Sequence, residues 1–465
     1  MSLAPITPMG AGRSAFGRPD GLLEHAVTPG SVHEHLAVHV LADGYKLVVD
    51  LDRSHGCRLV DARDGTEYLD CYSFFASLPI GFNHPDLAGE EFLGRLARAG
   101  VHKPANPDTY SVEYATFVDT FARVLGDPAL PHLFFVEGGA LAVENALKVA
   151  FDWKSRRNER AGRSEPGDMV LHLRHAFHGR SGYTLSLTNT DPVKTSRFPK
   201  FDWPRIESPA LRFPLAGHAE ENRRTEDDAL AQARTSFAEN PHRIACFIAE
   251  PIQAEGGDRH LSARFLGEMH ELCKANDALF VLDEVQTGVG ATGSRWAYEG
   301  LSLEPDVVAF AKKVQVGGVM AGRRVDDEPD NVFRVPGRIS STWGGGLVDM
   351  VRATRILQVL ERDNLVEHAA EMGEVLVDAL DRVASEHPGL VSNVRGRGLL
   401  CAVDLPTTED RDTVVRKMRE DERVIVLPCG ERSVRFRPSL VIQAHDVVEV
   451  VQALSRVVKK LEPAR

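Results

Sequence analysis

Five short runs of residues that are apolar almost throughout limit, more than any other feature, how this chain can fold. A strand with one face in water alternates apolar and polar residues, whereas a strand buried on both faces is apolar at successive positions. Segments with helical periodicity separate the runs, so repeated strand–helix units predict a mostly parallel α/β sheet with right-handed crossovers. The runs are HLFFV (132–136), MVLHL (169–173), IACFIAE (244–250), ALFVLDE (278–284) and PDVVAFA (305–311).

Two segments between these strands are predicted to be amphipathic helices. Residues 140–154 and 265–277 carry apolar residues three and four positions apart, which is the spacing of one helix face. The polar segment 215–240 is predicted to be an exposed loop and helix.

The pattern changes beyond about residue 346. Helical patterns at 349–362 and 364–386 are followed by the β-like runs LLCAVDL, RVIVLP and SVRFRP, which together predict a smaller α+β domain. The stretch from 39 to 74 is predicted to form hairpins that join this domain. We therefore expect an N-terminal segment at 1–80, a large domain at 81–345 and a small domain at 346–465.

Composition excludes several classes of function. The formal net charge of -12 argues against nucleic acid or an anionic membrane as a general partner. The six cysteines are scattered without a CxxC pair, as expected for reduced thiols in a cytoplasmic protein. The first residues, MSLAPITPMGAGRSAFG, lack the apolar stretch of a signal peptide, and no apolar run approaches the roughly 18 residues of a membrane span.

The segment FVLDEVQTGVGATG places Asp283 and Glu284 at the carboxyl end of a predicted buried strand. Ligands bind at that edge of parallel α/β sheets. A carboxylate there is costly without a partner. The residues alone leave two interpretations open, a helix-capping aspartate or an aspartate paired with a protonated heterocyclic nitrogen.

A second predicted buried strand runs directly into Lys312 and Lys313, in VVAFAKKVQVGGVMAG. Most lysines are solvated, and a lysine at the end of a core strand, followed by a glycine pair, is much less ordinary. Desolvation lowers a lysine pKa from about 10.4 and makes the free amine available as nucleophile and base.

Together, DEVQTG and FAKK…GG resemble the signature of the class III (omega-amino-acid) aminotransferases. These are pyridoxal 5'-phosphate (PLP) enzymes of fold type I, with a large α/β domain and a smaller α+β domain. The resemblance runs from about residue 45 to 445, and it is strongest to members that act on the ε-amino group of L-lysine. The stretches that carry it are GGALAVENALKVAFDWKSRR, IAEPIQAEGGD, AKKVQVGGVMAG and STWGGGLVDMVRA.

The resemblance implies a cofactor site. Lys312 would hold PLP through a Schiff base, and we prefer it to Lys313 because it follows the strand and Ala311 directly. Asp283 would pair with the pyridinium nitrogen and keep it protonated, so that the ring acts as an electron sink. The other implied contacts are Gln286 with the phenolic oxygen, Gly139 and Ala140 with the phosphate, Phe177 over the ring, and Glu250 as a supporting carboxylate.

Further residues are implied to bind substrate or to complete the site. Arg180 would hold a substrate carboxylate. Glu255 and Arg435 would form a switchable ion pair that opens to free Arg435 for 2-oxoglutarate. Thr342 would reach the phosphate of a neighbouring subunit, which implies a homodimer with shared sites.

Three positions depart from the family pattern. Ala140 lacks the hydroxyl of the Ser or Thr that is common there, so backbone groups would bind more of the phosphate. Ser340 stands where an amide side chain is usual, and Gly346 replaces a polar residue. The last two are expected near the entrance of the site and bear on substrate preference.

The expected reaction moves the ε-amino group of L-lysine to 2-oxoglutarate and yields L-glutamate and 2-aminoadipate 6-semialdehyde, which cyclises. Alternatives of the same class use 4-aminobutyrate, ornithine or N-acetylornithine as donor. A PLP aminomutase, which needs no keto acid, and a non-catalytic binding protein are the alternatives from other classes. No G-x-G-x-x-G follows an early strand, which disfavours an NAD-dependent dehydrogenase.

Overall fold

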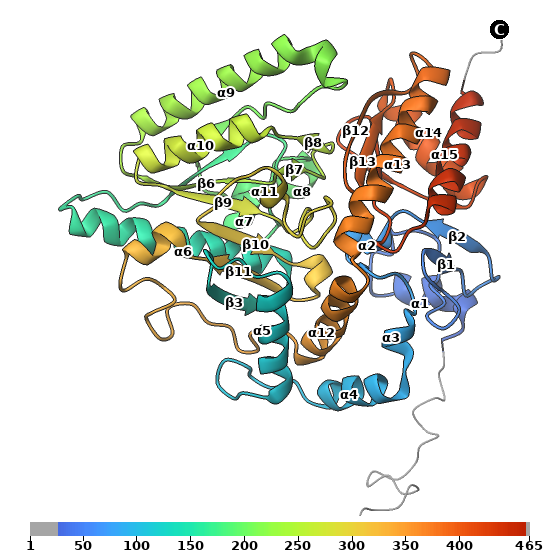
Figure 1. Ribbon diagram of the computed structural model, residues 1–465, viewed down its shortest axis with the longest axis horizontal. Coiled ribbons are helices and arrows are strands. Elements are labelled where there is room, and N and C mark those ends of the chain that lie inside the picture. Colours follow the sequence, from blue (N-terminus) through green and yellow to red (C-terminus); the bar gives the residue numbers. More distant parts are fainter. Residues whose placement is uncertain (1–26, 462–465) are drawn as a thin grey trace, which may run out of the picture.

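The computed structural model describes residues 27–461 (Figure 1). Residues 1–26 lie outside the described residues. They include the first residues, which were judged not to resemble a signal peptide, and the start of the predicted N-terminal segment. In the described part, no helix is both long enough and apolar enough to cross a membrane.

A seven-stranded sheet forms the large part of the molecule. Its order is β3-β11-β10-β9-β6-β4-β5, and every pairing that does not involve β11 is parallel. The prediction of a mostly parallel sheet is therefore confirmed, and the antiparallel β11 was not predicted. The strands are β3 His132–Val136, β4 Met169–Leu173, β5 Arg205–Ile206, β6 Ile244–Ala249, β9 Leu279–Asp283, β10 Val307–Phe310 and β11 Gly317–Ala321.

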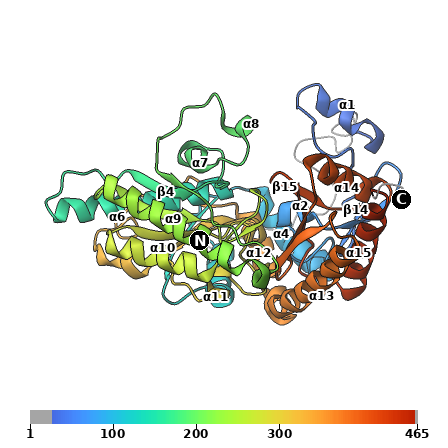
Figure 2. The ribbon, with the colours of Figure 1, turned by 90° about the horizontal axis from the view of Figure 1, so that it is seen from above.

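Both faces of this sheet are covered, which explains why its strands are apolar at successive positions. Phe280 and Phe310 lie in one hydrophobic cluster with residues of α5 (Val112–Val124) and α10 (Ala263–Ala275). Their chain neighbours Val281 and Ala309 lie in the other cluster with α6 (Gly139–Arg160). The exposed helix α9 (Ala219–Glu239) packs on α10 (Figures 1 and 2). The predicted helices at 140–154 and 265–277 are confirmed.

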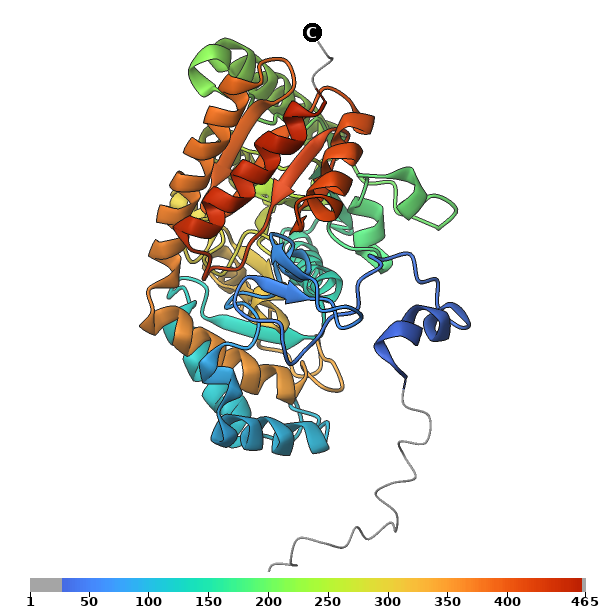
Figure 3. The ribbon, with the colours of Figure 1, turned by 90° about the vertical axis from the view of Figure 1, so that its right-hand side faces the viewer.

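The C-terminal part contains a four-stranded antiparallel sheet of order β12-β13-β16-β15, covered by helices. The first hairpin of the chain, β1–β2, pairs instead with β14 in a separate three-stranded sheet (Figure 3). Two segments more than 350 residues apart in the sequence, β2 and β14, thus lie side by side. The elements are β1 Arg58–Val60, β2 Glu67–Asp70, β12 Ser392–Arg397, β13 Leu400–Asp404, β14 Val424–Ile425, β15 Leu427–Cys429, β16 Ser433–Phe436, α13 Leu365–Glu386, α14 Thr408–Glu420 and α15 Ala444–Lys459.

The remaining elements connect these sheets. Helix α12 (Leu347–Arg362) packs on α5 and α4 and leads from the large sheet to α13. Helix α7 packs on α6, and Figure 2 shows the loop that carries α8 standing clear of the large sheet. The short elements are η1 Pro29–Ser31, α1 Val32–Ala37, α2 Ser73–Ala76, α3 Pro85–Ala88, α4 Glu90–Val101, α7 Gly182–Leu187, α8 Pro192–Thr195, η2 Leu215–His218, β7 Ile252–Gln253, β8 Arg259–His260, α11 Ala297–Gly300, η3 Lys312–Val314 and η4 Arg323–Asp327.

Candidate active site

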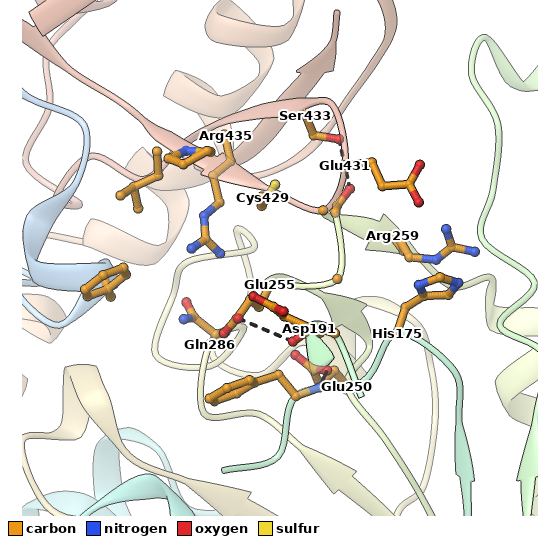
Figure 4. Close-up of a pocket in the computed structure, with 18 of the residues that line it drawn as sticks. His175, Asp191, Glu250, Glu255, Arg259, Gln286, Cys429, Glu431, Ser433 and Arg435 are labelled. Carbon is orange, nitrogen blue, oxygen red and sulfur yellow. Dashed lines mark hydrogen bonds between the residues drawn. The ribbon is translucent and has the colours of Figure 1, made fainter. Parts of the chain in front are cut away.

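A cleft of about 2010 Å³ opens where the carboxyl ends of the large-sheet strands face β15 and β16 (Figure 4). Its lining gathers side chains from segments that are far apart in the sequence. All of the predicted site residues except Thr342 line it, namely Gly139, Ala140, Phe177, Arg180, Glu250, Glu255, Asp283, Gln286, Lys312 and Arg435.

Asp283 and Glu284 face different surroundings. Asp283 ends β9, is 4% exposed and lines the cleft; its Oδ1 accepts from the backbone N–H of Val285 at 3.0 Å. Glu284 is buried and accepts from the Thr287 hydroxyl and from the Tyr298 N–H at 2.9 Å. Burial raises the pKa of Glu284 to about 7. Asp283 is therefore the carboxylate of this pair that faces the cleft, and Glu284 supports the turn that follows.

The backbone separates Lys312 from Lys313. Lys312 has a left-handed φ of 49°, uncommon for a residue with a side chain, and lines the cleft. Lys313 is 4% exposed, and its Nζ donates to the carbonyl of Gln286 at 2.9 Å. Burial, with Arg435 acting in the same direction, lowers the pKa of Lys312 against the opposing effect of Asp283. Lys312 is the lysine of this pair that is placed to react with a ligand.

A turn before α6 provides an anion-binding surface. Gly138 has a φ of 86°, and no side chain caps the first N–H groups of this 22-residue helix. Free N–H groups at a helix N-terminus, together with the helix dipole, favour a phosphate. The loop that carries Gly179 passes close to the start of α6. Gly179 has a φ of 122°, and a Cβ added to it would lie 2.6 Å from the Cβ of Ala140. The Ala140 side chain is thus packed against this loop.

Glu250 and Phe177 are coupled through the backbone. The Glu250 Oε1 accepts from the N–H of Phe177 at 2.9 Å (Figure 4). Burial, reinforced by the charge of Asp283, raises the pKa of Glu250 well above its ordinary value. The Glu250 carboxyl group fixes the loop that carries Phe177.

Two arginines in the cleft have no anionic partner in the part of the chain that the structure describes. Arg435, on β16, is 5% exposed, and its Nε forms no hydrogen bond with a described residue. Within residues 27–461, neither its side chain nor that of Arg180 forms an ion pair, and Arg180 is exposed at the cleft. A buried unpaired guanidinium is costly, so Arg435 is suited to bind a carboxylate ligand. Glu255, the predicted partner of Arg435, instead forms an ion pair with Lys194.

Ser340, Gly346 and Thr342 lie outside the cleft lining. Ser340 and Thr342 belong to an exposed segment. At Gly346 a Cβ would lie 2.6 Å from Asp349 Oδ2, so a larger residue requires that carboxylate to move. The roles of Ser340 and Gly346 in substrate preference stay predictions.

Four residues in and around the site were missed in the sequence. Tyr45 and Phe75 reach the cleft from the N-terminal segment, with the Phe75 ring centroid 5.9 Å from Lys312 Nζ. Phe75 lies in a turn of four consecutive left-handed residues, Ser73–Ala76. No local pattern indicated these residues or Lys194. His178 stood beside Phe177 in the motif, but a lone histidine is a weak signal.

His178 directly contacts the central carboxylate. Its Nδ1 lies 2.7 Å from Asp283 Oδ2, and its side chain is fully buried. Because an ionised carboxylate only accepts, Nδ1 carries the hydrogen. His178 therefore orients Asp283 toward the cleft.

Replacing His178 by leucine should lower kcat about tenfold, because the Asp283 carboxylate then turns away from its working position. His178→Asn keeps an N–H near the position of Nδ1 and should restore most of that loss. Steady-state kinetics of both variants at saturating cofactor tests this role. Equal losses in the two variants would show that packing, and not the hydrogen bond, is what matters.

These features together fit a planar cofactor with a phosphate at one end. One cleft is faced by an amine, a carboxylate for a ring nitrogen, an aromatic side chain and an uncapped helix. Gln286 Oε1 is buried there without a hydrogen-bond partner among the described residues. The residues present fit PLP.

Comparison with known proteins identifies relatives over nearly the whole chain. The family model of aminotransferase class-III matches residues 40–458. The L-lysine-epsilon aminotransferases of Amycolatopsis lactamdurans and Streptomyces clavuligerus are each 58% identical, over 91% of this chain and 94% and 93% of their own lengths. A solved structure of lysine aminotransferase from M. tuberculosis, in the internal aldimine form, has a TM-score of 0.91 and 55% identity. It covers 94% of this chain and 100% of its own.

Proposed function

The chain belongs to the class III aminotransferases, PLP-dependent enzymes, and on this basis we propose that it transfers the ε-amino group of L-lysine to 2-oxoglutarate. The products are 2-aminoadipate 6-semialdehyde, which cyclises to a piperideine carboxylate, and L-glutamate. The high identity to enzymes named for the lysine ε-amine supports this donor.

Different residues of the cleft would contact different parts of the cofactor. When bound, PLP supplies the carbonyl carbon that exchanges amino groups and the ring that accepts electrons. Lys312 would attach it covalently and then, as a free amine, carry a proton between substrate and cofactor. Asp283 would hold the ring nitrogen in its protonated form. Gln286 would contact the phenolic oxygen, and Gly139 and Ala140 the phosphate.

Residues around the proposed ring position would have separate roles. Phe177 would cover the ring and exclude water from one side. Glu250 would hold the backbone of Phe177 in place through the hydrogen bond to its N–H. The lowered pKa of Lys312 supports its use as a base, because a desolvated amine is more readily deprotonated.

The observation that carries the substrate proposal is the pair of arginines without partners. Arg180 would bind the α-carboxylate of L-lysine at the far end of the donor. Arg435 would bind a carboxylate of 2-oxoglutarate. This pairing suits a donor with a distant carboxylate and a dicarboxylic acceptor, and Glu255 would regulate access to Arg435.

The absorption spectrum of the purified holoenzyme tests the function. L-lysine without a keto acid should remove the visible band of the bound cofactor, and 2-oxoglutarate should restore it. A band that persists with L-lysine but is lost with 4-aminobutyrate, ornithine or N-acetylornithine would reject the named donor. Turnover without any keto acid would indicate an aminomutase. Protein without a visible band, even after added PLP, would indicate a binding protein.

We also propose a homodimer in which Thr342 reaches the phosphate of the neighbouring site. Thr342 is exposed, on a segment whose Gly344 lies against Pro107. Pro107 lies in the loop between α4 and α5. Three large side chains in or beside this loop are unusually exposed for their type, namely Val101 at 70%, Tyr110 at 81% and Val112 at 79%. Sedimentation equilibrium should give twice the chain mass of 51.1 kDa. A monomeric mass with full activity would reject this arrangement.

Two further expectations stay proposals. The enzyme would work in the cytoplasm, which is consistent with six cysteines that are all free and buried; activity confined to another cell fraction would refute it. The division at residues 80 and 345 would separate domains. Limited proteolysis with preferred cuts elsewhere would move those boundaries.

A further inference from the structure

A lysine that belongs to neither the cofactor site nor the predicted substrate site lies beside Glu255. Lys194 is part of α8, in the segment between β4 and β5, and lines the same cleft. Its Nζ forms an ion pair with Glu255 Oε1 and lies 6.0 Å from the centroid of the Phe177 ring. The two charged side chains are 32% and 27% exposed, so water screens the pair only partly.

One carboxylate therefore stands between two cations of the cleft. Glu255 is held on one side by Lys194 and by the Thr190 hydroxyl at 3.3 Å. Figure 4 shows Arg435 reaching from the opposite side, with its guanidinium directed toward Glu255 and Gln286. Among residues 27–461, Arg435 has no ion-pair partner of its own. In this arrangement the Glu255 carboxylate is paired with Lys194 and forms no ion pair with Arg435.

The backbone beneath Glu255 is fixed to the C-terminal sheet. The Glu255 carbonyl accepts from the Gly430 N–H at 3.0 Å. Arg395 donates to the carbonyls of Gly257 and Asp258 at 2.7 and 2.8 Å, and Asp258 forms a buried ion pair with Arg437. A change of partner must therefore come from rotation of the Glu255 side chain.

We propose that Lys194 is a specificity-determining residue that holds Glu255 away from Arg435 and so leaves Arg435 free for a dicarboxylic keto acid. The proposal rests on the function proposed above, because it assumes that Arg435 binds a substrate carboxylate. Without Lys194, the Glu255 carboxylate is free to turn toward the guanidinium of Arg435, and a dicarboxylate must then displace Glu255 before it binds. A partly exposed ion pair shifts such an equilibrium by about fivefold.

Glutarate tests this inference, because it is a dicarboxylate without a keto group and binds without turnover. Isothermal titration of the holoenzyme should show that Lys194→Met weakens glutarate binding about fivefold. Lys194→Arg should bind as the unsubstituted enzyme does. Lys200→Met removes an exposed lysine of the same segment that lies outside the cleft lining, and it controls for the loss of one positive charge.

The same titrations in a Glu255→Gln background separate the mechanism from simple charge attraction. A glutamine does not pair strongly with Arg435, so Lys194→Met should then have no more effect than Lys200→Met. A weakening of equal size with and without the Glu255 carboxylate would overturn the proposal. So would unchanged glutarate binding by Lys194→Met in the otherwise unsubstituted enzyme. Failure of the unsubstituted enzyme to bind glutarate at all would instead reject the acceptor in the proposed function.

Discussion

Replacing Lys312 by alanine should abolish transamination, with kcat at least about 10⁴-fold below that of the unsubstituted enzyme. The substitution removes both the amine that would attach the cofactor and the base that would move the proton. Its neighbours would remain in place, because the Lys312 side chain makes no hydrogen bond with any of residues 27–461. Formation of L-glutamate from L-lysine and 2-oxoglutarate measures the effect. Normal turnover by the variant would refute the assignment.

Lys313→Met is the matched control, because it removes the adjacent lysine and keeps an unbranched side chain. Lys313 supports the turn at Gln286 through one hydrogen bond, so the loss of activity should stay within about tenfold. Borohydride reduction of the unsubstituted enzyme, followed by peptide mass spectrometry, adds a readout independent of turnover. The cofactor should be found on Lys312, and its recovery on Lys313 would reverse the two roles.

Asp283→Asn should lower kcat by about 10²–10³-fold. An asparagine keeps the size of the side chain and can still accept from the Val285 N–H, but it carries no negative charge. Without that charge, a bound pyridine ring would lose its proton and accept electrons less well. Steady-state kinetics at saturating PLP separates this effect from weaker cofactor binding. A loss below about threefold would show that the carboxylate charge is not used.

Glu284→Gln is the control for that variant, since it makes the same chemical change one residue further along the chain. Because the pKa of Glu284 is raised to about 7, its carboxyl group is already partly neutral near pH 7, and glutamine resembles that form. Its activity should stay within about threefold of the unsubstituted enzyme. A large loss here would mean that the turn, and not the Asp283 charge, is the sensitive feature.

The sequence predicted the central pair of residues because the ends of buried strands are visible in it. Parallel strands β9 and β10 are neighbours, with Ala309 opposite Asp283. Lys312 follows two residues after the end of β10 and therefore lies at the same sheet edge as Asp283. The antiparallel β11 was missed because its sequence, GGVMA, is short and begins with two glycines.

The doublets Asp283–Glu284 and Lys312–Lys313 show where local patterns stop being informative. Both doublets lie at the end of a strand, where the alternation of side chains stops and the backbone is irregular. The direction of each side chain is then set by particular torsion angles, such as the left-handed φ of 49° at Lys312. Residue type and spacing do not encode such angles.

What the sequence alone determined was the alternation of parallel strands and helices apart from β11, the burial of the sheet on both faces, and the position of an acid and an amine at its edge. These properties depend on local periodicity and on the chemistry of single residues. Only the tertiary structure decided that His178 orients Asp283, that Phe75 lies near Lys312, and that Lys194 rather than Arg435 is paired with Glu255. Such contacts join segments that are separated in the chain, and their geometry is fixed by how the sheets and loops pack in three dimensions.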